Sequence, residues 1–365
     1  MSAPSKTPIM LRLSSLMLVV YLLLGLAFFV ALGNDALDDK NDFEFFSDST
    51  TYEKAAEDRL AVSEGPIGLI ALDANYLGPI TILRLVDSNR YGVIAVNIML
   101  FIVAISMIAR TRPIRRDILI LCLALNPLTL SSLLSVNKEI LTILSVVLVN
   151  YAVGKRSFTA FAISVAVGLL ARWQMSLVCV VAYLSCTMLN PFWRNRLVTI
   201  LLLLVAISIA YPIARPFLSA FDTILEEASQ TNEGGGFFFR LMDLQNEAAY
   251  ILAFIPKTLH LMFGILLRLD RFGEMEVFHN YTWVAMHSAA MLVLTGAVVA
   301  TRRLTLRTDS VYIAIIYCSV VALSPIYAPR YFYPVHVLLA ITLALPRPAR
   351  PDATSLAALS TRQPK

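Results

Sequence analysis

The chain has few cysteines, few charges and no nucleotide-binding loop. Its four cysteines lie inside apolar runs, and no two of them form a C-x-x-C spacing. This distribution argues against both a disulfide framework and a thiolate metal site. Only 15% of the residues are charged, and the phosphate-binding pattern G-x-x-x-x-G-K-[ST] is absent. No feature of the sequence therefore indicates ATP-driven work.

Apolar surface, in contrast, is abundant. Hydrophobic residues make up 58% of the 365 positions and the mean hydropathy is +0.71, which is more than one soluble core can bury. The sequence therefore predicts an all-α polytopic membrane protein with about ten transmembrane helices. The predicted spans are residues 9–32, 91–109, 117–136, 140–154, 157–171, 175–190, 197–216, 283–300, 309–326 and 334–346.

Basic residues alternate between the two ends of these spans. Lys and Arg cluster in the turns 110–116, 155–156, 194–196 and 302–307 and in the tail after residue 346, which all fall on the side where the chain begins. The segments on this side hold 17 of the 30 Lys and Arg residues but only 3 of the 25 Asp and Glu residues. By the positive-inside rule this side, with both termini, is cytoplasmic. The net charge of +5 therefore indicates membrane orientation and no nucleic-acid partner.

In this topology two long regions, residues 33–90 and 217–282, face outward. The first begins with the acidic segment 33–65. Each contains an apolar piece that cannot be a simple span, because crossing there would invert every later basic turn, so we predict interfacial or re-entrant helices in both. Residues 1–346 then form a single transmembrane domain, and the Pro-, Ala- and Ser-rich residues 347–365 a disordered cytoplasmic tail. An alternative for the first apolar run is a signal peptide, although the run is longer than such cores usually are.

The predicted spans contain almost no ionisable residues, and His287 is the main exception. This disfavours a proton-driven pump, which needs charged groups at mid-membrane depth. Several Lys and Arg residues nevertheless face outward, against the positive-inside trend, so each requires a partner. One partner is a lipid-linked phosphate, which guanidinium groups bind in bidentate fashion. The other is a salt bridge to an outer carboxylate. The residues concerned are Lys138, Arg172, Arg215, Arg240, Lys257 and Arg330, with Glu139 beside the first.

Three sequence patterns resemble those of a known family. The spacing Asp48-x-x-x-Tyr52-x-x-x-Ala56 in the first outer region is similar to a D-x-x-x-Y-x-x-x-A pattern of the GT-C superfamily of integral-membrane glycosyltransferases. The stretch NPLTLSSLLSVNKEILTIL resembles a P…S…KE segment of bacterial polysaccharide-cluster membrane proteins, and APRYFYPVHVLLA resembles their late R-Y-x-x-P turn. The order of helices and long outer loops also resembles the GT-C arrangement over most of the chain.

The resemblance implies transfer of a sugar or glycan from a polyprenyl-(pyro)phosphate carrier to a glycan or lipid acceptor, on the periplasmic or extracellular face of a bacterial inner membrane. Asp48 would be the general base that takes the acceptor hydroxyl proton, and Glu139 a second catalytic carboxylate. Cationic side chains would stabilise charge on the departing phosphate. Substrate-binding candidates are Tyr52, Lys138, Arg172, Arg215, Arg240, Arg330 and Tyr331.

Other interpretations remain open. Asp48 is also well spaced to cap a short helix, and the aromatic residues of the outer regions could anchor the chain at the membrane interface instead of stacking on sugars. A polysaccharide repeat-unit polymerase of the Wzy type is a close sibling. A flippase or transporter of lipid-linked glycans and a non-catalytic scaffold belong to other classes.

No metal site is predicted from the sequence. The first outer region has no D-x-[DN]-x-[DN]-G loop, so the acids from Asp35 to Glu44 are interpreted as a solvated spacer. The chain departs from the GT-C pattern in having no D-x-D or D-E pair at the expected position, so a divalent cation as cofactor has no marked position. His260, His279 and His336 are too dispersed in the sequence to suggest a metal site.

Overall fold

The computed structural model describes residues 7–32, 47–61, 76–187, 189–214, 235–247, 250–268 and 280–346. Within these ranges every regular element is an α-helix or a 3-10 helix. In order they are α1 (Thr7–Leu32), α2 (Ser47–Ala61), α4 (Leu77–Leu85), α5 (Arg90–Thr111), α6 (Arg116–Ala124), α7 (Pro127–Leu134), α8 (Glu139–Lys155), α9 (Phe158–Ala171), α10 (Trp173–Ser185), α11 (Arg196–Ala214), α13 (Gly235–Asn246), α14 (Tyr250–Phe263), η4 (Gly264–Leu267), α15 (Asn280–Ala300), α16 (Asp309–Val321), η6 (Pro329–Phe332) and α17 (Tyr333–Ala344).

Five stretches of the described chain are long and apolar enough to cross a membrane, and six if the bent pair α6–α7 counts as one span. The five are Leu13–Ala31, Arg90–Thr111, Arg196–Ile213, Tyr250–Leu267 and Tyr281–Ala300. The helices α9, α10 and α16 are apolar but shorter. The all-helical class and the presence of apolar membrane-length helices are therefore confirmed, whereas the number of ten spans stays a prediction.

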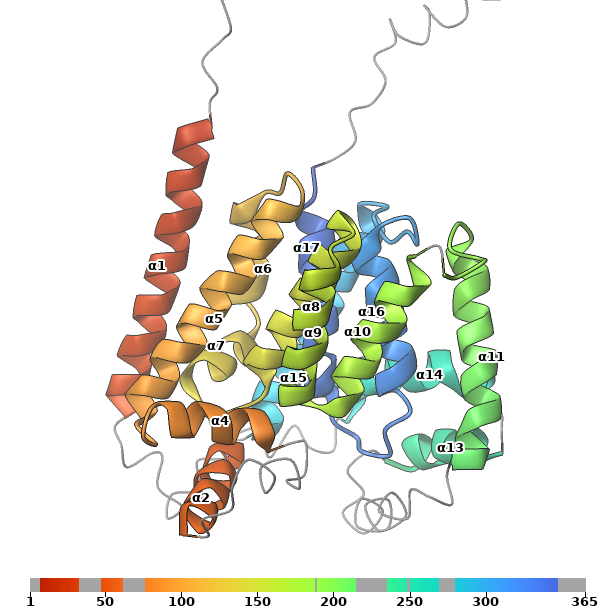
Figure 1. Ribbon diagram of the computed structural model, residues 1–365, viewed down its shortest axis with the longest axis horizontal. Helices are drawn as coiled ribbons and strands as arrows, with labels where there is room; N and C mark the ends of the chain where they lie inside the picture. Colours follow the sequence, from red (N-terminus) through yellow and green to blue (C-terminus); the bar gives the residue numbers. More distant parts are fainter. Residues whose placement is uncertain are drawn as a thin grey trace, which may run out of the picture.

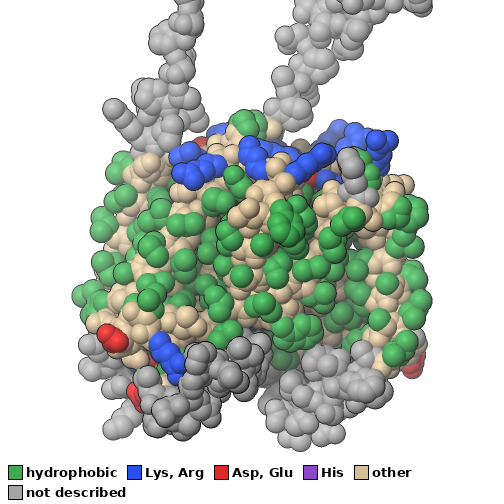
Figure 2. Space-filling view, in the orientation of Figure 1, with side chains coloured by type: hydrophobic (Ala, Val, Ile, Leu, Met, Phe, Trp, Pro, Cys, Tyr) green, Lys and Arg blue, Asp and Glu red, His purple; other side chains and the backbone are tan. Residues whose placement is uncertain are grey.

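Exposed apolar side chains cover the outside of the bundle. Leu16, Leu23 and Leu24 of α1 are 58%, 60% and 65% exposed. In Figure 2 hydrophobic side chains form a broad belt, with Lys and Arg gathered along one edge above it. A belt of this kind is stable in lipid and not in water.

The basic residues of that edge come from turns between helices. They belong to residues 110–116, 155–156, 194–196 and 302–307, which follow or precede helices that run upright in Figure 1. We call this end of the bundle the arginine-rich face. Arg303, after α15, donates through Nη1 to the carbonyl of Thr342 at 3.2 Å, so the last turns of α15 and α17 meet there.

A sharp corner replaces the single helix predicted for residues 117–136. Helix α6 ends at Ala124, α7 begins at Pro127, and the two are bent by 81°. Asn126 takes an extended conformation and its side-chain Oδ1 accepts from the backbone N–H of Leu128 at 3.0 Å. Proline at the first helical position disfavours helical geometry in the residue before it, which explains the break. The prediction of a single helix here was wrong, whereas the bent pair is still long and apolar enough to form one span.

Buried polar side chains at this corner are paired with one another. The side-chain Nδ2 of Asn126 lies 2.9 Å from Nδ1 of His287 on α15. The hydroxyl groups of Thr129 and Tyr333 lie 2.6 Å apart, and Nε2 of His336 lies 3.0 Å from the carbonyl oxygen of Cys122. Hydrogen bonds between helices compensate for the cost of burying polar groups in an apolar bundle.

The helices α2 and α4 lie at the end of the bundle opposite the arginine-rich face, where Figure 1 shows α4 running across the ends of the upright helices. A Cβ atom on Gly78 of α4 would lie 2.3 Å from the carbonyl oxygen of Leu170, the last turn of α9. Only glycine permits this close approach. Helix α4 therefore packs by its backbone on α9, and its interfacial position stays a prediction.

Helix α14 belongs to the second apolar piece that is predicted to return to its own side, and three of its residues contact the same part of the chain. Tyr250 donates to the carbonyl of Ser319 at 2.6 Å, Lys257 to that of Ser324 at 3.0 Å, and the rings of His260 and Tyr327 lie 5.4 Å apart. These contacts all belong to the last turn of α16 and the segment after it. Because Tyr250–Leu267 also has the length and composition of a membrane span, its return to the same side stays a prediction.

Candidate functional site

The loop before α8 is held by a dense set of hydrogen bonds. Asn97 of α5 donates through Nδ2 to the carbonyl of Ser135 at 2.9 Å, and Asn137 donates through its own Nδ2 to Oγ of Ser135 at 2.6 Å. The Oδ1 of Asn137 then accepts from the backbone N–H of Glu139 at 2.9 Å. Glu139 is the first residue of α8. The loop therefore fixes the start of α8 and the position of the Glu139 side chain.

Arg172 sits at the break between α9 and α10. Its backbone is extended, with φ −164° and ψ 140°, so it ends one helix and begins the next. Its Nη2 donates to Oε1 of Glu139 at 3.2 Å. The two side chains are only 14% and 15% exposed, so the pair is largely shielded from solvent. Of the two partners expected for Arg172, a lipid-linked phosphate or a carboxylate, the structure shows the carboxylate.

The third element is the 3-10 turn η6. Tyr331 in this turn presents its ring to Arg172, whose Cζ lies 3.7 Å from the ring centroid. Arg330 approaches the same ring, with its Cζ 5.9 Å from the centroid. Tyr317 on α16 donates its hydroxyl to the carbonyl of Tyr331 at 2.5 Å, which anchors the turn. Cation–π contacts of this kind fix the plane of a guanidinium group.

Together Glu139, Arg172, Arg330 and Tyr331 form what we call the Arg172 cluster. It joins residues from three turns that are far apart in the sequence, at the end of the bundle opposite the arginine-rich face. Besides its bond to Glu139, Arg172 has a buried Nε–H without a hydrogen-bond partner in the described chain, and Oε1 of Gln174 is in the same state. Buried donors normally have partners, so an unpaired guanidinium N–H at a cluster of cations is a place where an anion can bind.

Helix α2 packs against the loop that precedes Glu139. The Oγ of Ser49 accepts from the backbone N–H of Val136 at 3.0 Å and lies 3.3 Å from its carbonyl oxygen. Asp48 is the second residue of α2 and so lies inside the helix, in its first turn, and not at the N-cap position that the sequence suggested for it. Its side chain lies outside the described part of the structure. The backbone of Asp48 is nevertheless adjacent to Ser49, and thereby close to the loop of Glu139.

The side chain of Tyr52 is buried and packs against a neighbouring aromatic ring. It is 5% exposed, and its ring meets that of Tyr76 edge to face at 5.4 Å between centroids. Ala56, one helical turn later, is fully buried. The D-x-x-x-Y-x-x-x-A spacing thus places Tyr52 and Ala56 on the face of α2 that is covered by its neighbours.

Among the described contacts, none brings Arg240 or Lys257 to the Arg172 cluster. Arg240 is exposed on α13, and Arg215 lies outside the described residues. Lys257 is fully buried on α14, where its Nζ donates to Oε1 of Gln245 at 2.7 Å and to the carbonyl of Ser324. Lys138 is half-buried at the start of α8, beside Glu139.

Sequence reasoning missed one ion pair and one anchoring residue near this end of the bundle. Arg90 forms a bidentate ion pair with Glu53 of α2, in which Nε donates to Oε1 at 2.8 Å and Nη2 donates to Oε2 at 2.7 Å. It is another basic residue that faces away from the arginine-rich face, so the expectation of a partner for each such residue could have found it. Tyr317 lies in an apolar helix, and nothing in its sequence context separates it from its neighbours.

Groups that could hold a metal ion are absent from the described part of the chain, where no three His, Cys, Asp or Glu side chains come together. The rings of His287 and His336 lie 6.2 Å apart, and His279 lies outside the described residues. Comparison of the chain with protein-family models, with curated proteins and with solved structures finds no match.

Proposed function

We propose that this chain is a glycosyltransferase of the bacterial inner membrane that moves a sugar or glycan from a polyprenyl-(pyro)phosphate carrier to an acceptor on the outer face. The arginine-rich face would be cytoplasmic by the positive-inside rule. The Arg172 cluster would then lie at the outer face, together with α2 and α4. The course of α14 along the turn after α16 supports a topology in which this piece returns to its own side.

The observation that carries the proposal is the convergence of Arg172, Arg330 and Tyr331 beside Glu139. Arg172 is held in place from two directions, by the Glu139 carboxylate at 3.2 Å and by the Tyr331 ring at 3.7 Å, while its Nε–H is unpaired in the described chain. A cation fixed in this way needs no reorganisation when charge builds up on a departing phosphate. Lys138 and Arg330 add positive charge at the same place.

The contacts suggest separate roles for the two carboxylates. Glu139 is engaged with Arg172, so we assign it to orienting the guanidinium group. Asp48 keeps the role of general base. In the transfer step the acceptor oxygen attacks the anomeric carbon, the bond from that carbon to the phosphate oxygen breaks, and the acceptor proton passes to Asp48. The phosphate leaves with the bonding electrons and stays on the polyprenyl chain, where Arg172 pairs with its charge.

The test uses the purified chain in proteoliposomes with a polyprenyl-linked sugar that carries a radioactive label. We expect label to reach the acceptor, and Asp48→Asn to lower the rate by about 10²- to 10⁴-fold, as for loss of a general base. Arg172→Gln should lower it by about 10²- to 10³-fold, as for loss of one preorganised donor. Glu57→Gln is the matched control, because Glu57 is an exposed carboxylate on the same helix as Asp48. Equal rates for Asp48→Asn and Glu57→Gln would remove the general-base assignment.

The length of the product distinguishes a glycosyltransferase from its sibling function, a repeat-unit polymerase. A single added unit indicates a glycosyltransferase, and a ladder of repeat units indicates a polymerase of the Wzy type.

One observation favours a transporter of lipid-linked glycans as the second candidate. Broken helices in membranes mark transport sites in many carriers, and the corner between α6 and α7 carries the buried contact between Asn126 and His287. A transporter would move labelled lipid across sealed vesicles without transferring its sugar, and His287→Ala would stop that movement. Sugar transfer that persists in His287→Ala but not in Arg172→Gln would exclude this candidate.

A further inference from the structure

A hollow of about 630 Å³ opens among the turns of the arginine-rich face. Four turns contribute to it: those between α5 and α6, between α8 and α9, between α10 and α11, and between α15 and α16. Its size is in the range of ligand pockets. The charged side chains in its lining are Arg112, Arg156, Arg194, Arg196, Arg307 and Asp309.

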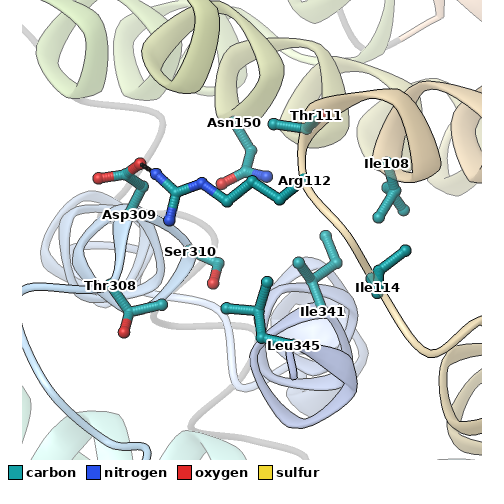
Figure 3. Close-up of a pocket in the computed structure, with 10 residues that line it drawn as sticks. All are labelled: Ile108, Thr111, Arg112, Ile114, Asn150, Thr308, Asp309, Ser310, Ile341 and Leu345. Carbon is teal, nitrogen blue, oxygen red and sulfur yellow. Dashed lines mark hydrogen bonds and ion pairs between the residues drawn. The ribbon is translucent and has the colours of Figure 1, made fainter. Parts of the chain in front are cut away.

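Asp309 builds one wall of this hollow. Its two carboxylate oxygens accept separately, Oδ2 from Arg112 and Oδ1 from Nη2 of Arg196 at 2.5 Å. Arg196 also donates to the carbonyl of Leu306 at 2.8 Å and lies over the ring of Tyr312. Figure 3 shows Arg112 reaching from the end of α5 to Asp309, across a smaller pocket that Asn150 and Ile341 help to line. Arg112 and Asp309 therefore help to line both pockets.

The lining of the hollow remains strongly positive after the negative charge of Asp309 is counted. One carboxylate faces five guanidinium groups among the described lining residues, an excess of four positive charges. Arg156, Arg194 and Arg307 are exposed, whereas Asp309 has a side chain that is only 12% exposed. Converging guanidinium groups in a concave site concentrate the field and attract anions, phosphates in particular.

We propose that this hollow binds a phosphate group, and that the phosphate belongs to the headgroup of an anionic phospholipid. The segment between α10 and α11 argues for the lipid source. Leu189, Phe192 and Leu197 in and after it are 79%, 46% and 55% exposed, and they flank the lining residue Arg194. Apolar side chains beside a basic hollow at the end of a membrane bundle provide contacts for both parts of a lipid, the acyl chains and the headgroup. A free phosphate ion would use the arginines alone.

The experiment is native mass spectrometry of the full chain, released from detergent micelles that contain phosphatidylglycerol or phosphatidylcholine. The test variant is R194Q/R307Q, which removes two exposed charges from the hollow. The control is R115Q/R302Q, which removes two charges from the same face outside the hollow lining. The chromatographic profile and the midpoint of thermal unfolding establish that each variant is folded.

We expect the wild type and the control to retain phosphatidylglycerol in preference to phosphatidylcholine, and R194Q/R307Q to bind it at least about tenfold more weakly. Equal weakening in both double variants would show general attraction to a positive face and would overturn the site. Retention by R194Q/R307Q at the wild-type level would overturn it as well. In a second arm, inorganic phosphate or pyrophosphate at millimolar concentration is added; displacement of the lipid by either would overturn the lipid assignment. The site lies at the opposite face from the Arg172 cluster, so its failure and that of the proposed glycosyltransferase activity are independent.

Discussion

Replacing Glu139 and Arg172 separately and together measures how strongly the Arg172 cluster is held. An exposed ion pair contributes about 0–1 kcal/mol, but these side chains are 14% and 15% exposed, so the hydrogen bond to a charged group should contribute about 1.5–3 kcal/mol. Glu139→Gln should therefore destabilise the fold by about 1–2 kcal/mol. Arg172→Gln should cost about 2–3 kcal/mol, because it also removes the stack on Tyr331, which contributes about 0.5–2 kcal/mol.

The assay is a denaturant titration of the detergent-solubilised chain, with the double variant completing the cycle. We expect a coupling free energy of about 1–2 kcal/mol, since the Glu139→Gln substitution has little left to remove once Arg172 is gone. A coupling below about 0.5 kcal/mol would refute the reasoning, because two residues that do not interact have additive effects. The same variants separate structure from activity. A purely structural pair predicts that activity follows the folded fraction, whereas a phosphate site predicts a far larger loss for Arg172→Gln.

Three further predictions address the packing of the bundle. Gly78→Ala should destabilise the fold by about 1–3 kcal/mol, since its new methyl group would overlap a backbone carbonyl oxygen at 2.3 Å. The control Gly296→Ala has no neighbour within 4 Å and should be neutral or stabilising by up to about 1 kcal/mol. Thermal unfolding compares the two variants, and equal midpoints would contradict the packing of α4. Asp309→Asn should destabilise by about 1.5–3 kcal/mol in a denaturant titration, because it weakens two contacts to guanidinium groups; an unchanged titration would mean that the wall of the hollow is not formed. Exchanging the charges of Glu53 and Arg90 should restore most of the stability that either single reversal removes, and a double reversal no better than the singles would show that α2 is docked differently.

Helix positions could be predicted from the sequence because lipid-facing helices require long apolar runs, and such runs are visible directly. The exceptions arise where a local signal is hidden inside such a run. Asn126-Pro127 is a turn signal, yet the apolar residues on both sides continue the hydrophobic pattern over it. Likewise α16 ends at Val321, several residues before its predicted limit, although the chain stays apolar to Ala322 and Leu323. Hydropathy reports the solvent around a segment and not the direction of its axis.

The candidate site was predictable as a set of turns but not as an arrangement. Glu139, Arg172 and Tyr331 were each expected at the same side of the membrane, because the alternation of basic turns places them there. That Arg172 would contact both of the others depends on the packing of α8, α9 and η6, which no local pattern encodes. The burial of Tyr52 was hidden for the same reason, since a tyrosine on an amphipathic helix can face either a neighbour or a substrate.

The positive-inside rule counts charges, whereas the structure separates them by their partners. At the arginine-rich face, residues such as Arg194 and Arg307 are exposed, and an exposed guanidinium group can be solvated without a carboxylate partner. At the opposite end, Arg90 and Arg172 are each bound to a glutamate. Lys257 differs from both groups, since it is fully buried and contacts a carbonyl oxygen, an amide oxygen, the sulfur of a methionine and the ring of Phe238, all neutral. Burying a cation among neutral acceptors in the middle of an apolar segment is costly. The cost would be lowest if α14 stayed near the end of the bundle, and the contacts of Tyr250 and Lys257 with the end of α16 and the segment after it agree with such a position.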